Sequence, residues 1–175
     1  MSAIAGRDGK LYPPPRMEDV VENERHILAG IAVFDVWIFN PDRAEQNLIW
    51  SEDIGVWAID HDMAFCGNNE DGTAWMDENV YASFNPGKLA KLGLNQRDTK
   101  SWTELICVQG AGMSRAAVDS AQRRGLLTVD NAARYKRFLR KRSVGIHDLV
   151  FRSMNFKEIP GIDASLRGAS QPILS

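Results

Sequence analysis

A loop rich in oxygen-bearing side chains is the part of the sequence best suited to chemistry. Asp42 and Arg43 open it, Asn47 lies five residues after Asp42, and Asp60 follows thirteen residues after Asn47. Carboxylate and amide oxygens are the ligands that hard divalent cations such as Mg²⁺ select. Phosphoryl transfer from ATP needs such ligands and a carboxylate near the attacking hydroxyl. The spacing therefore predicts a phosphoryl-transfer site built on Asp42, Asn47 and Asp60.

A predicted β-hairpin would bring these residues together. Two short runs of strand-forming side chains, residues 47–50 and 56–59, are separated by a polar, glycine-containing turn. Antiparallel pairing of the runs would place Asn47 and Asp60 at the same end of the ribbon. Pro41 disfavours helical backbone in the residue before it, so the loop with the first carboxylate begins there. We therefore expect the three polar side chains to meet at one end of the hairpin.

A long apolar helix is expected before this loop. From residue 17 to about residue 39, apolar side chains recur at helical spacing and cover much of the helix circumference, which predicts a buried central helix. Ser114 and Asp130 are expected N-terminal caps in the second half. The fold class predicted is α+β and mostly α-helical. Three later segments have helical composition: residues 101–108, 114–124 and 131–141.

The expected organisation is one lobe with two irregular ends. Residues 1–16 contain three consecutive prolines and predict an extended arm. Residues 17–159 form the lobe, in which the polar residues 66–79 predict an irregular, mobile loop. Residues 160–175 mix Gly, Pro and Ser with a few aliphatic side chains and predict a loosely held tail.

Charge is distributed unevenly along the 175 residues. Residues 1–79 hold sixteen acidic and five basic side chains, whereas residues 80–175 hold seven acidic and sixteen basic ones. The acidic half disfavours nucleic acid and favours a cation site. Cys66 and Cys107 lack metal-binding spacing and are expected to be free thiols. With no apolar run long enough for a bilayer and no secretion signal, a cytoplasmic protein that does not enter membranes is expected.

The polar loop and the hairpin together carry a family resemblance. Asp-Arg-x-x-x-Asn at residues 42–47, then Leu48-Ile49, then Ala58-Ile59-Asp60-His61, resembles the catalytic segment of the HipA-like kinases. The segment is more distantly similar to that of the phosphatidylinositol 3- and 4-kinases and of protein kinases. The resemblance covers residues 34–65. It implies a protein-kinase-like C-terminal lobe with a small catalytic hairpin, and Mg²⁺ and ATP as cofactors.

The resemblance also implies a role for each motif residue. Asp42 would be the catalytic carboxylate, and Arg43 would steady the catalytic loop or a phosphate. Asn47 and Asp60 would be the metal ligands, with Asp60 as the main one, bridging the ATP phosphates. Ile49 would lie under the adenine ring.

Two neighbours of Asp60 differ from ordinary protein kinases. His61 replaces the Phe that follows the metal-binding Asp, a feature that HipA-like sequences share, and no catalytic role is assigned to it. Asp62 stands where the family usually has Gly. It adds an acidic group beside the expected metal site.

The ATP-clamping N-lobe of a kinase is not expected in this sequence. Kinases of this type use a phosphate-covering loop and a lysine from an N-terminal sheet, but the only lysine upstream of the loop is Lys10. Three functions stay open: a serine/threonine-type kinase lobe completed by an N-lobe from another polypeptide, a catalytically inactive regulator or decoy, or a pure interaction module. Each predicts a protein partner or a homo-oligomer over the N-lobe-facing surface.

A basic run in the second half supports a further alternative. Residues 134–142 carry six Lys and Arg side chains, and such a helix can neutralise the phosphates of nucleic acid. The favoured interpretation is a solvated helix face with Tyr135, Phe138 and Leu139 turned inward, or a partner for the acidic first half. Nucleic-acid binding through this helix is the less favoured alternative.

Overall fold

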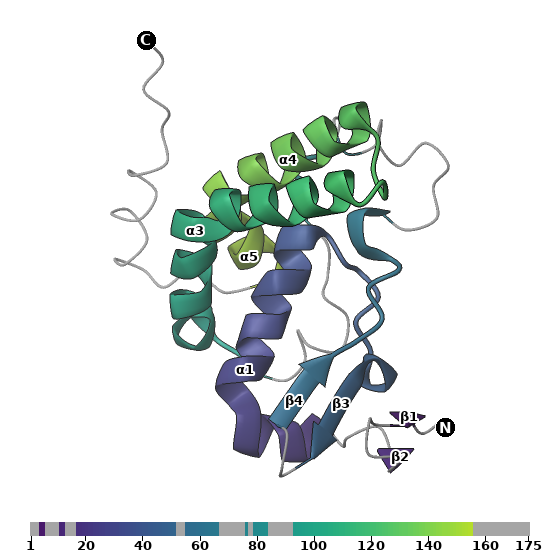
Figure 1. The fold of residues 1–175 in the computed structure, drawn as a ribbon. Helices are drawn as coiled ribbons and strands as arrows, with labels where there is room; N and C mark the ends of the chain where they lie inside the picture. The colour runs from purple at the N-terminus through teal and green to yellow at the C-terminus, as the bar shows by residue number, and fades with distance from the viewer. Residues whose placement is uncertain are drawn as a thin grey trace, which may run out of the picture.

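The computed structural model describes residues 4–5, 11–12, 17–51, 55–66, 76, 79–83 and 93–155. These residues are mostly helical and include two small two-stranded antiparallel sheets, β1–β2 and β3–β4 (Figure 1). The predicted class, α+β and mostly α-helical, is therefore confirmed. The main elements are β1 Ile4–Ala5, β2 Leu11–Tyr12, α1 Met17–Ile38, β3 Leu48–Ser51, β4 Gly55–Ala58, α3 Gln96–Arg123, α4 Val129–Val144 and α5 Ile146–Ser153.

Helix α1 is central, between the β3–β4 hairpin and the later helices (Figure 1). The backbone leaves helical geometry at Glu24, with φ −128°, which separates a short first piece from the rest of the helix. The second piece is apolar on most sides and is correspondingly buried, as expected for a core helix. Its end at Ile38 confirms the predicted helix to within one residue. Side chains of α1 with at most 1% exposure include Leu28, Ala29, Ala32, Val33 and Val36.

The C-terminus of α1 is closed by a Schellman motif. The N–H of Asn40 donates to the carbonyl of Asp35 at 2.8 Å, and the N–H of Phe39 donates to that of Val36 at 3.3 Å. Phe39 occupies the left-handed position, with φ 54°, where glycine is usual. Pro41 then prevents further helix. The Schellman motif and Pro41 together turn the chain sharply into the polar loop that begins at Asp42.

The β3–β4 hairpin has one buried and one outward face. Its register pairs Leu48 with Ala58 and Ile49 with Trp57, so the predicted hairpin is confirmed with small shifts of its ends. Leu48 is 1% exposed and faces the core, whereas Trp57 is 61% exposed. Because directly opposite residues of a sheet share a face, Ile49 and Trp57 lie together on the outward side.

One helix, α3, replaces the two helices predicted over residues 101–108 and 114–124. It begins after Asn95, whose side chain accepts hydrogen bonds from the N–H groups of the first turn in a capping box. The expectation that Ser114 is an N-cap is wrong. Its hydroxyl donates to a carbonyl one turn earlier inside the same helix, at 3.0 Å.

Close packing of α3 on α4 explains why the helix continues through Gly110. Residues 109–113 contain two glycines, which disfavour helix when considered alone. A Cβ at Gly110 would lie 2.5 Å from Ser143 Oγ of α4, so this crossing needs glycine. The tertiary contact overrides the local propensity.

The last two helices differ from expectation at their starts. Helix α4 confirms the predicted helix over residues 131–141, but Thr128, not Asp130, accepts the capping hydrogen bond. Asp130 lies in the first turn, where a negative charge still favours the helix dipole. Helix α5 was not predicted as a separate element, and it buries Leu149 and Val150.

Arg142 is fully buried, although the basic run suggests a surface position. Its guanidinium lies 5.3 Å from the ring centroids of both Phe39 and Phe138. Two of its acceptor carbonyls, those of Val36 and Trp37, belong to the last turn of α1, where helix carbonyls lack the usual N–H donor four residues later. Arg142 thus stabilises the end of α1 from another helix. Its acceptors among the described residues include the backbone carbonyls of Val36, Trp37, Val80 and Ala82.

An ion pair joins the first part of α1 to the start of α3. Arg25 donates to both carboxylate oxygens of Asp98, at 3.1 and 2.7 Å. The hydrogen bond from Arg25 lowers the pKa of Asp98, which also completes the capping box of α3. At the next contact of the two helices, a Cβ at Gly30 would lie 2.6 Å from the Trp102 indole, so glycine permits close approach.

Several expectations fall outside the described residues. These are the tail at residues 160–175, most of the arm at residues 1–16 and most of the loop at residues 66–79. Within the arm, β1 and β2 form a short antiparallel pair. None of the helices in the described ranges has the length and apolar character that a bilayer crossing requires.

Candidate functional site

A buried ion pair anchors the polar loop to the central helix. Arg43 Nε donates to Asp35 Oδ2 at 2.8 Å, and its Nη2 donates to Oδ1 at 2.9 Å. Both side chains have 0% exposure. The Nδ2 of Asn40 adds a third hydrogen bond to Asp35, at 2.9 Å. The buried carboxylate is therefore compensated by three donors, as a buried charge requires.

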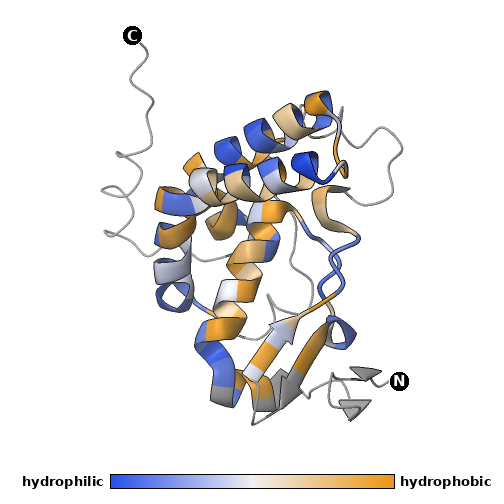
Figure 2. Ribbon diagram, viewed as in Figure 1, coloured by the Kyte–Doolittle hydropathy of each residue, from blue (hydrophilic) through white to orange (hydrophobic). Residues whose placement is uncertain are grey.

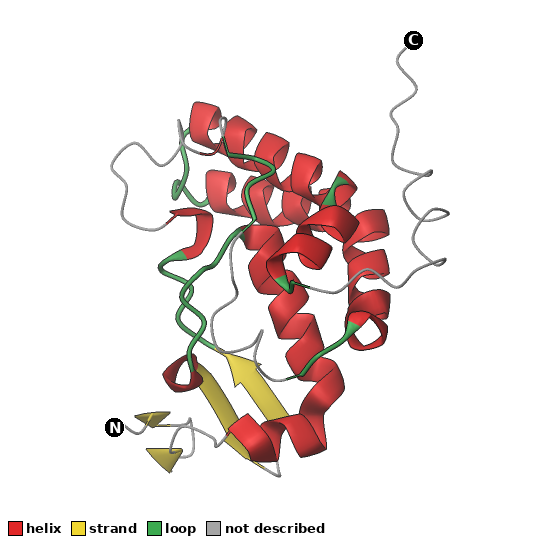
Figure 3. Ribbon diagram, turned by 180° about the vertical axis from the view of Figure 1, so that it is seen from behind, coloured by secondary structure: helices red, strands yellow, loops and turns green. Residues whose placement is uncertain are grey.

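The remaining nitrogen of Arg43 holds the open end of the hairpin. Its Nη1 donates to the carbonyls of Asn47 at 2.9 Å and Ile59 at 2.6 Å. The N–H of Ile59 also donates to the carbonyl of Asn47, at 3.0 Å. Figure 3 shows the loop after α1 and the loop after β4 side by side. One guanidinium thus fixes Asn47 relative to the residue that precedes Asp60.

Asn47 connects the hairpin back to Asp42. Its Nδ2 donates to the backbone carbonyl of Asp42 at 3.0 Å, and no described contact uses its Oδ1. Asn47 is 4% exposed, whereas Asp42 and Asp60 are exposed at the surface. The structure therefore brings all three predicted residues to the same end of the hairpin, and the two carboxylates face solvent.

Backbone strain is concentrated around this end of the hairpin. Asp60 has φ 56°, and Phe65, a few residues later, also has φ 56°. Phe39, which precedes the loop, is a third residue in the left-handed region. Such conformations cost of order 1–3 kcal/mol each for non-glycine residues and occur preferentially at functional sites. The conformation of Asp60 is held by its neighbours against its local preference.

Charges gather on the segment that follows Asp60. Asp60 raises the pKa of Asp62, first by hydrogen bonding to it and second by repulsion, and Asp42 adds a smaller repulsion. Partial burial lowers the pKa of His61. The charge of Arg43 lowers it further, while Asp35 and Asp60 oppose the shift. His61 thus stands in the sequence between Asp60 and Asp62, whose close approach raises the pKa of Asp62.

The repulsion between these carboxylates predicts a change in titration. In Asp60→Asn, the charge repulsion that raises the pKa of Asp62 is removed, and the new amide N–H can donate to the Asp62 carboxylate, so this pKa should fall toward its ordinary value. Carbon-detected NMR of the Asp62 carboxyl across the acidic range measures the shift. Asp119, whose pKa is lowered by the hydrogen bond from Lys136 in α4, is the internal control and should be unaffected. An unchanged Asp62 titration would contradict the proximity of the two groups.

The raised pKa of Asp62 also has a defined sign for stability. A carboxyl that binds its proton more tightly in the folded state favours folding at low pH. This contribution is lost as the pH rises through the folded-state pKa of Asp62. A cation that neutralised Asp60 would remove the penalty at neutral pH.

The donor set is small for a metal ion. In the described part of the chain, no group of three or more His, Cys, Asp or Glu side chains is arranged to hold a metal. The predicted ligands are one carboxylate, from Asp60, and one amide oxygen, from Asn47. Mg²⁺ is commonly held by one or two protein oxygens and completes its shell with waters and phosphate oxygens. The residues therefore fit a Mg²⁺–phosphate complex better than a bare cation.

The geometry adds two residues to those predicted from the sequence. Asp35 holds Arg43 in place. The sequence feature that could have indicated this role is that Asp35 is the single carboxylate inside the apolar run from Ile27 to Asn40. Trp57 shares the outward face of the hairpin with Ile49, the residue expected under the adenine ring. An indole that is 61% exposed in this position offers a flat apolar surface to a nucleobase.

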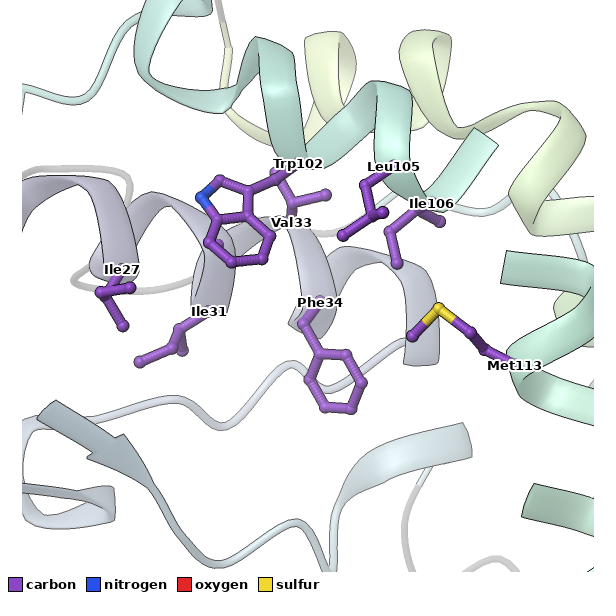
Figure 4. A pocket seen from close by; sticks show the side chains of 9 residues that line it. Ile27, Ile31, Val33, Phe34, Trp102, Leu105, Ile106 and Met113 are labelled. Atoms are coloured by element: carbon purple, nitrogen blue, oxygen red, sulfur yellow. The ribbon is translucent and has the colours of Figure 1, made fainter. Parts of the chain in front are cut away.

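A second, apolar pocket lies beside the polar loop. It has a volume of about 260 Å³ between α1 and α3, and Figure 4 shows side chains of both helices pointing into it. Phe34 links it to the loop, because its ring contacts that of His61 with centroids 5.8 Å apart. With no titratable side chain in its wall, the pocket does not supply acid–base chemistry. It is lined by Ile27, Gly30, Ile31, Val33, Phe34, Trp102, Leu105, Ile106 and Met113.

Comparison with protein-family models, curated proteins and solved structures gave no significant match.

Proposed function

We propose that this chain is a HipA-like serine/threonine-type kinase C-lobe, which transfers a phosphoryl group from Mg²⁺-ATP to a protein hydroxyl when an N-lobe completes it. The single observation that supports this proposal most is the hydrogen-bonding of Arg43. Through Asp35, Asn47 and Ile59, it joins the central helix, the loop and both strands of the hairpin at its open end. That arrangement keeps Asp42, Asn47 and Asp60 within one small region.

Each residue then has a definite task. Asn47 and Asp60 would hold Mg²⁺, which supplies charge neutralisation at the phosphates. Asp42 would accept the proton of the attacking hydroxyl, and its exposure leaves room for a protein substrate. Ile49 and Trp57 would contact the adenine from the outward face of the hairpin.

The partner in this proposal is the chain that supplies the N-lobe. It would cover the outward face of the hairpin, where Trp57 presents an exposed indole. Large exposed aromatic side chains are typical anchors of protein interfaces. A homo-oligomer that covers the same face would fit the alternative function, a catalytically inactive regulator or decoy that still binds Mg²⁺-ATP.

Release of γ-phosphate from Mg²⁺-ATP tests transfer without knowledge of the protein substrate, because water replaces the hydroxyl. We expect slow release by the unaltered chain and at least about 100-fold less by Asp42→Asn, since a positioned general base commonly contributes that much. Both proteins should bind Mg²⁺-ATP equally. Equal release by the two proteins, with binding retained, would contradict the role of Asp42 as the general base and favour the inactive regulator.

A further inference from the structure

The helical second half carries a large excess of positive charge. Residues 93–155 contain twelve Lys and Arg side chains and five Asp and Glu side chains. Four of the five acids already form ion pairs: Asp98 with Arg25, Glu104 with Lys100, Asp119 with Lys136, and Asp148 with Arg152. Apart from the buried Arg142, the excess is therefore found mainly on the outer surface of α3 and α4.

The packing of the two helices leaves these cations on the solvent-facing sides of α3 and α4. Helices α3 and α4 run antiparallel, as the contacts Gly110–Ser143 and Asp119–Lys136 show. Their buried positions face each other and α1, and Figure 2 shows the hydrophilic segments that alternate with them along both helices. We define the basic face as Arg115, Arg123, Arg124, Arg134, Arg140 and Lys141, none of which forms an ion pair with a described acidic residue.

Exposed aliphatic side chains lie at both ends of the basic face. Leu126 and Val129, at the turn between α3 and α4, are 65% and 70% exposed. Val144, which follows Lys141 near the other end, is 62% exposed. A surface that binds only a phosphate backbone does so through charged and polar groups, and exposed aliphatic side chains do not contribute to it. Arginine beside exposed apolar groups is characteristic of protein–protein interfaces.

Aromatic residues are turned away from this surface. The aromatic side chains of α3 and α4 are Trp102, Tyr135 and Phe138. Phe138 is 2% exposed, and Tyr135 packs its ring on Phe65. Trp102 packs against α1, where its Nε1 donates to the carbonyl of His26. Base stacking, on which single-stranded nucleic-acid binding depends, is therefore not available on the basic face.

We propose that the basic face of α3–α4 binds an acidic protein segment that also carries aliphatic side chains. The carboxylates of the segment would pair with Arg115, Arg123, Arg134 and their neighbours. Its aliphatic side chains would cover Leu126, Val129 and Val144. This surface is separate from the polar loop, so the interaction does not depend on the proposed phosphoryl transfer.

Fluorescence anisotropy with three labelled probes tests the proposal. The probes are a peptide of about 20 residues made of Glu and Leu, a Glu–Ser peptide of equal length and charge, and a 20-bp DNA duplex, since an interface uses about 20 residues a side. We expect the Glu–Leu peptide to bind at least about tenfold more tightly than the Glu–Ser peptide at about 50 mM salt. The binding of both peptides should weaken as the salt concentration is raised.

Three variants separate the parts of the surface. Arg134→Glu/Lys141→Glu should weaken the binding of both peptides at least about tenfold. Leu126→Ser/Val129→Ser should remove the advantage of the Glu–Leu peptide and leave the Glu–Ser peptide unchanged. The matched control, Arg97→Glu/Lys100→Glu, reverses two charges in the first turns of α3 and should change neither. Circular dichroism verifies that each variant is folded.

The same measurements define the results that overturn the proposal. DNA that binds more tightly than both peptides would identify the basic face as a nucleic-acid surface. Absence of peptide binding at low salt, or binding that Arg134→Glu/Lys141→Glu does not weaken, would show that the face is only a solvated helix surface.

Discussion

Replacing Arg142 by Met should destabilise the fold by about 4 kcal/mol or more, because four carbonyls lose the hydrogen bond from Arg142, and the loss at a buried carbonyl costs about 1–3 kcal/mol. The guanidinium of Arg142 donates to carbonyls of Val36 and Trp37 at the end of α1, and to those of Val80 and Ala82. Such a loss is a large part of the total stability of a domain, which is about 5–15 kcal/mol. Urea unfolding followed by circular dichroism measures it.

Two further variants show whether geometry or charge is responsible. Arg142→Lys keeps the charge, but a lysine cannot reach four carbonyls and stack between Phe39 and Phe138. Its loss of unfolding free energy should therefore be smaller than that of Arg142→Met, but still measurable. Arg140→Met, two residues earlier on the exposed side of α4, should change the unfolding free energy by less than about 0.5 kcal/mol. Similar losses for Arg142→Met and Arg140→Met would contradict the capping role of Arg142.

Replacing Arg43 by Met should cost about 3–5 kcal/mol, because it leaves the Asp35 carboxylate buried without its partner. It should also release the end of the hairpin, since Arg43 holds the carbonyls of Asn47 and Ile59. Hydrogen exchange of the Ile59 amide, which donates to Asn47, should accelerate more than exchange of amides in α3. Urea unfolding and exchange followed by NMR measure the two effects.

A double variant separates the buried charge from the positioning contacts. Asp35→Leu/Arg43→Met removes both charges and should recover much of the lost stability, as uncharged replacements of buried pairs often do. Exchange of the Ile59 amide should stay fast, because the contacts of Arg43 are still missing. Arg25→Met, which breaks the partly exposed pair with Asp98, should cost no more than about 1 kcal/mol. Slow Ile59 exchange in Arg43→Met would contradict the positioning role.

Local patterns were sufficient to predict the elements that form the site. The apolar spacing of α1 and the alternation in β3–β4 are strong periodic signals, and both elements were predicted nearly to the residue. Asn47 comes just before the first strand and Asp60 comes just after the second, so antiparallel pairing of the two strands places both residues at the open end of the hairpin.

Residues that act through tertiary contacts were not predictable in the same way. Gly110 lies in α3 because Ser143 is close, and nothing in residues 109–113 indicates that neighbour. Arg142 is of a residue type that is usually exposed, and only its position on the inner side of α4 distinguishes it from the other basic residues of that helix. Asp35 finds its partner eight residues later, after the chain has turned at Phe39. Each depends on a crossing that the sequence does not specify.

The most direct test of the polar site is calorimetric titration of Mg²⁺-ATP into the chain and into Asp60→Ala. Asn47 and Asp60 are the expected metal ligands, so we predict measurable binding by the unaltered chain and at least about tenfold weaker binding by the variant. Titration of ATP without Mg²⁺ should resemble the variant. Binding that is equal in both proteins, or absent from both, would contradict a Mg²⁺-nucleotide site at this end of the hairpin.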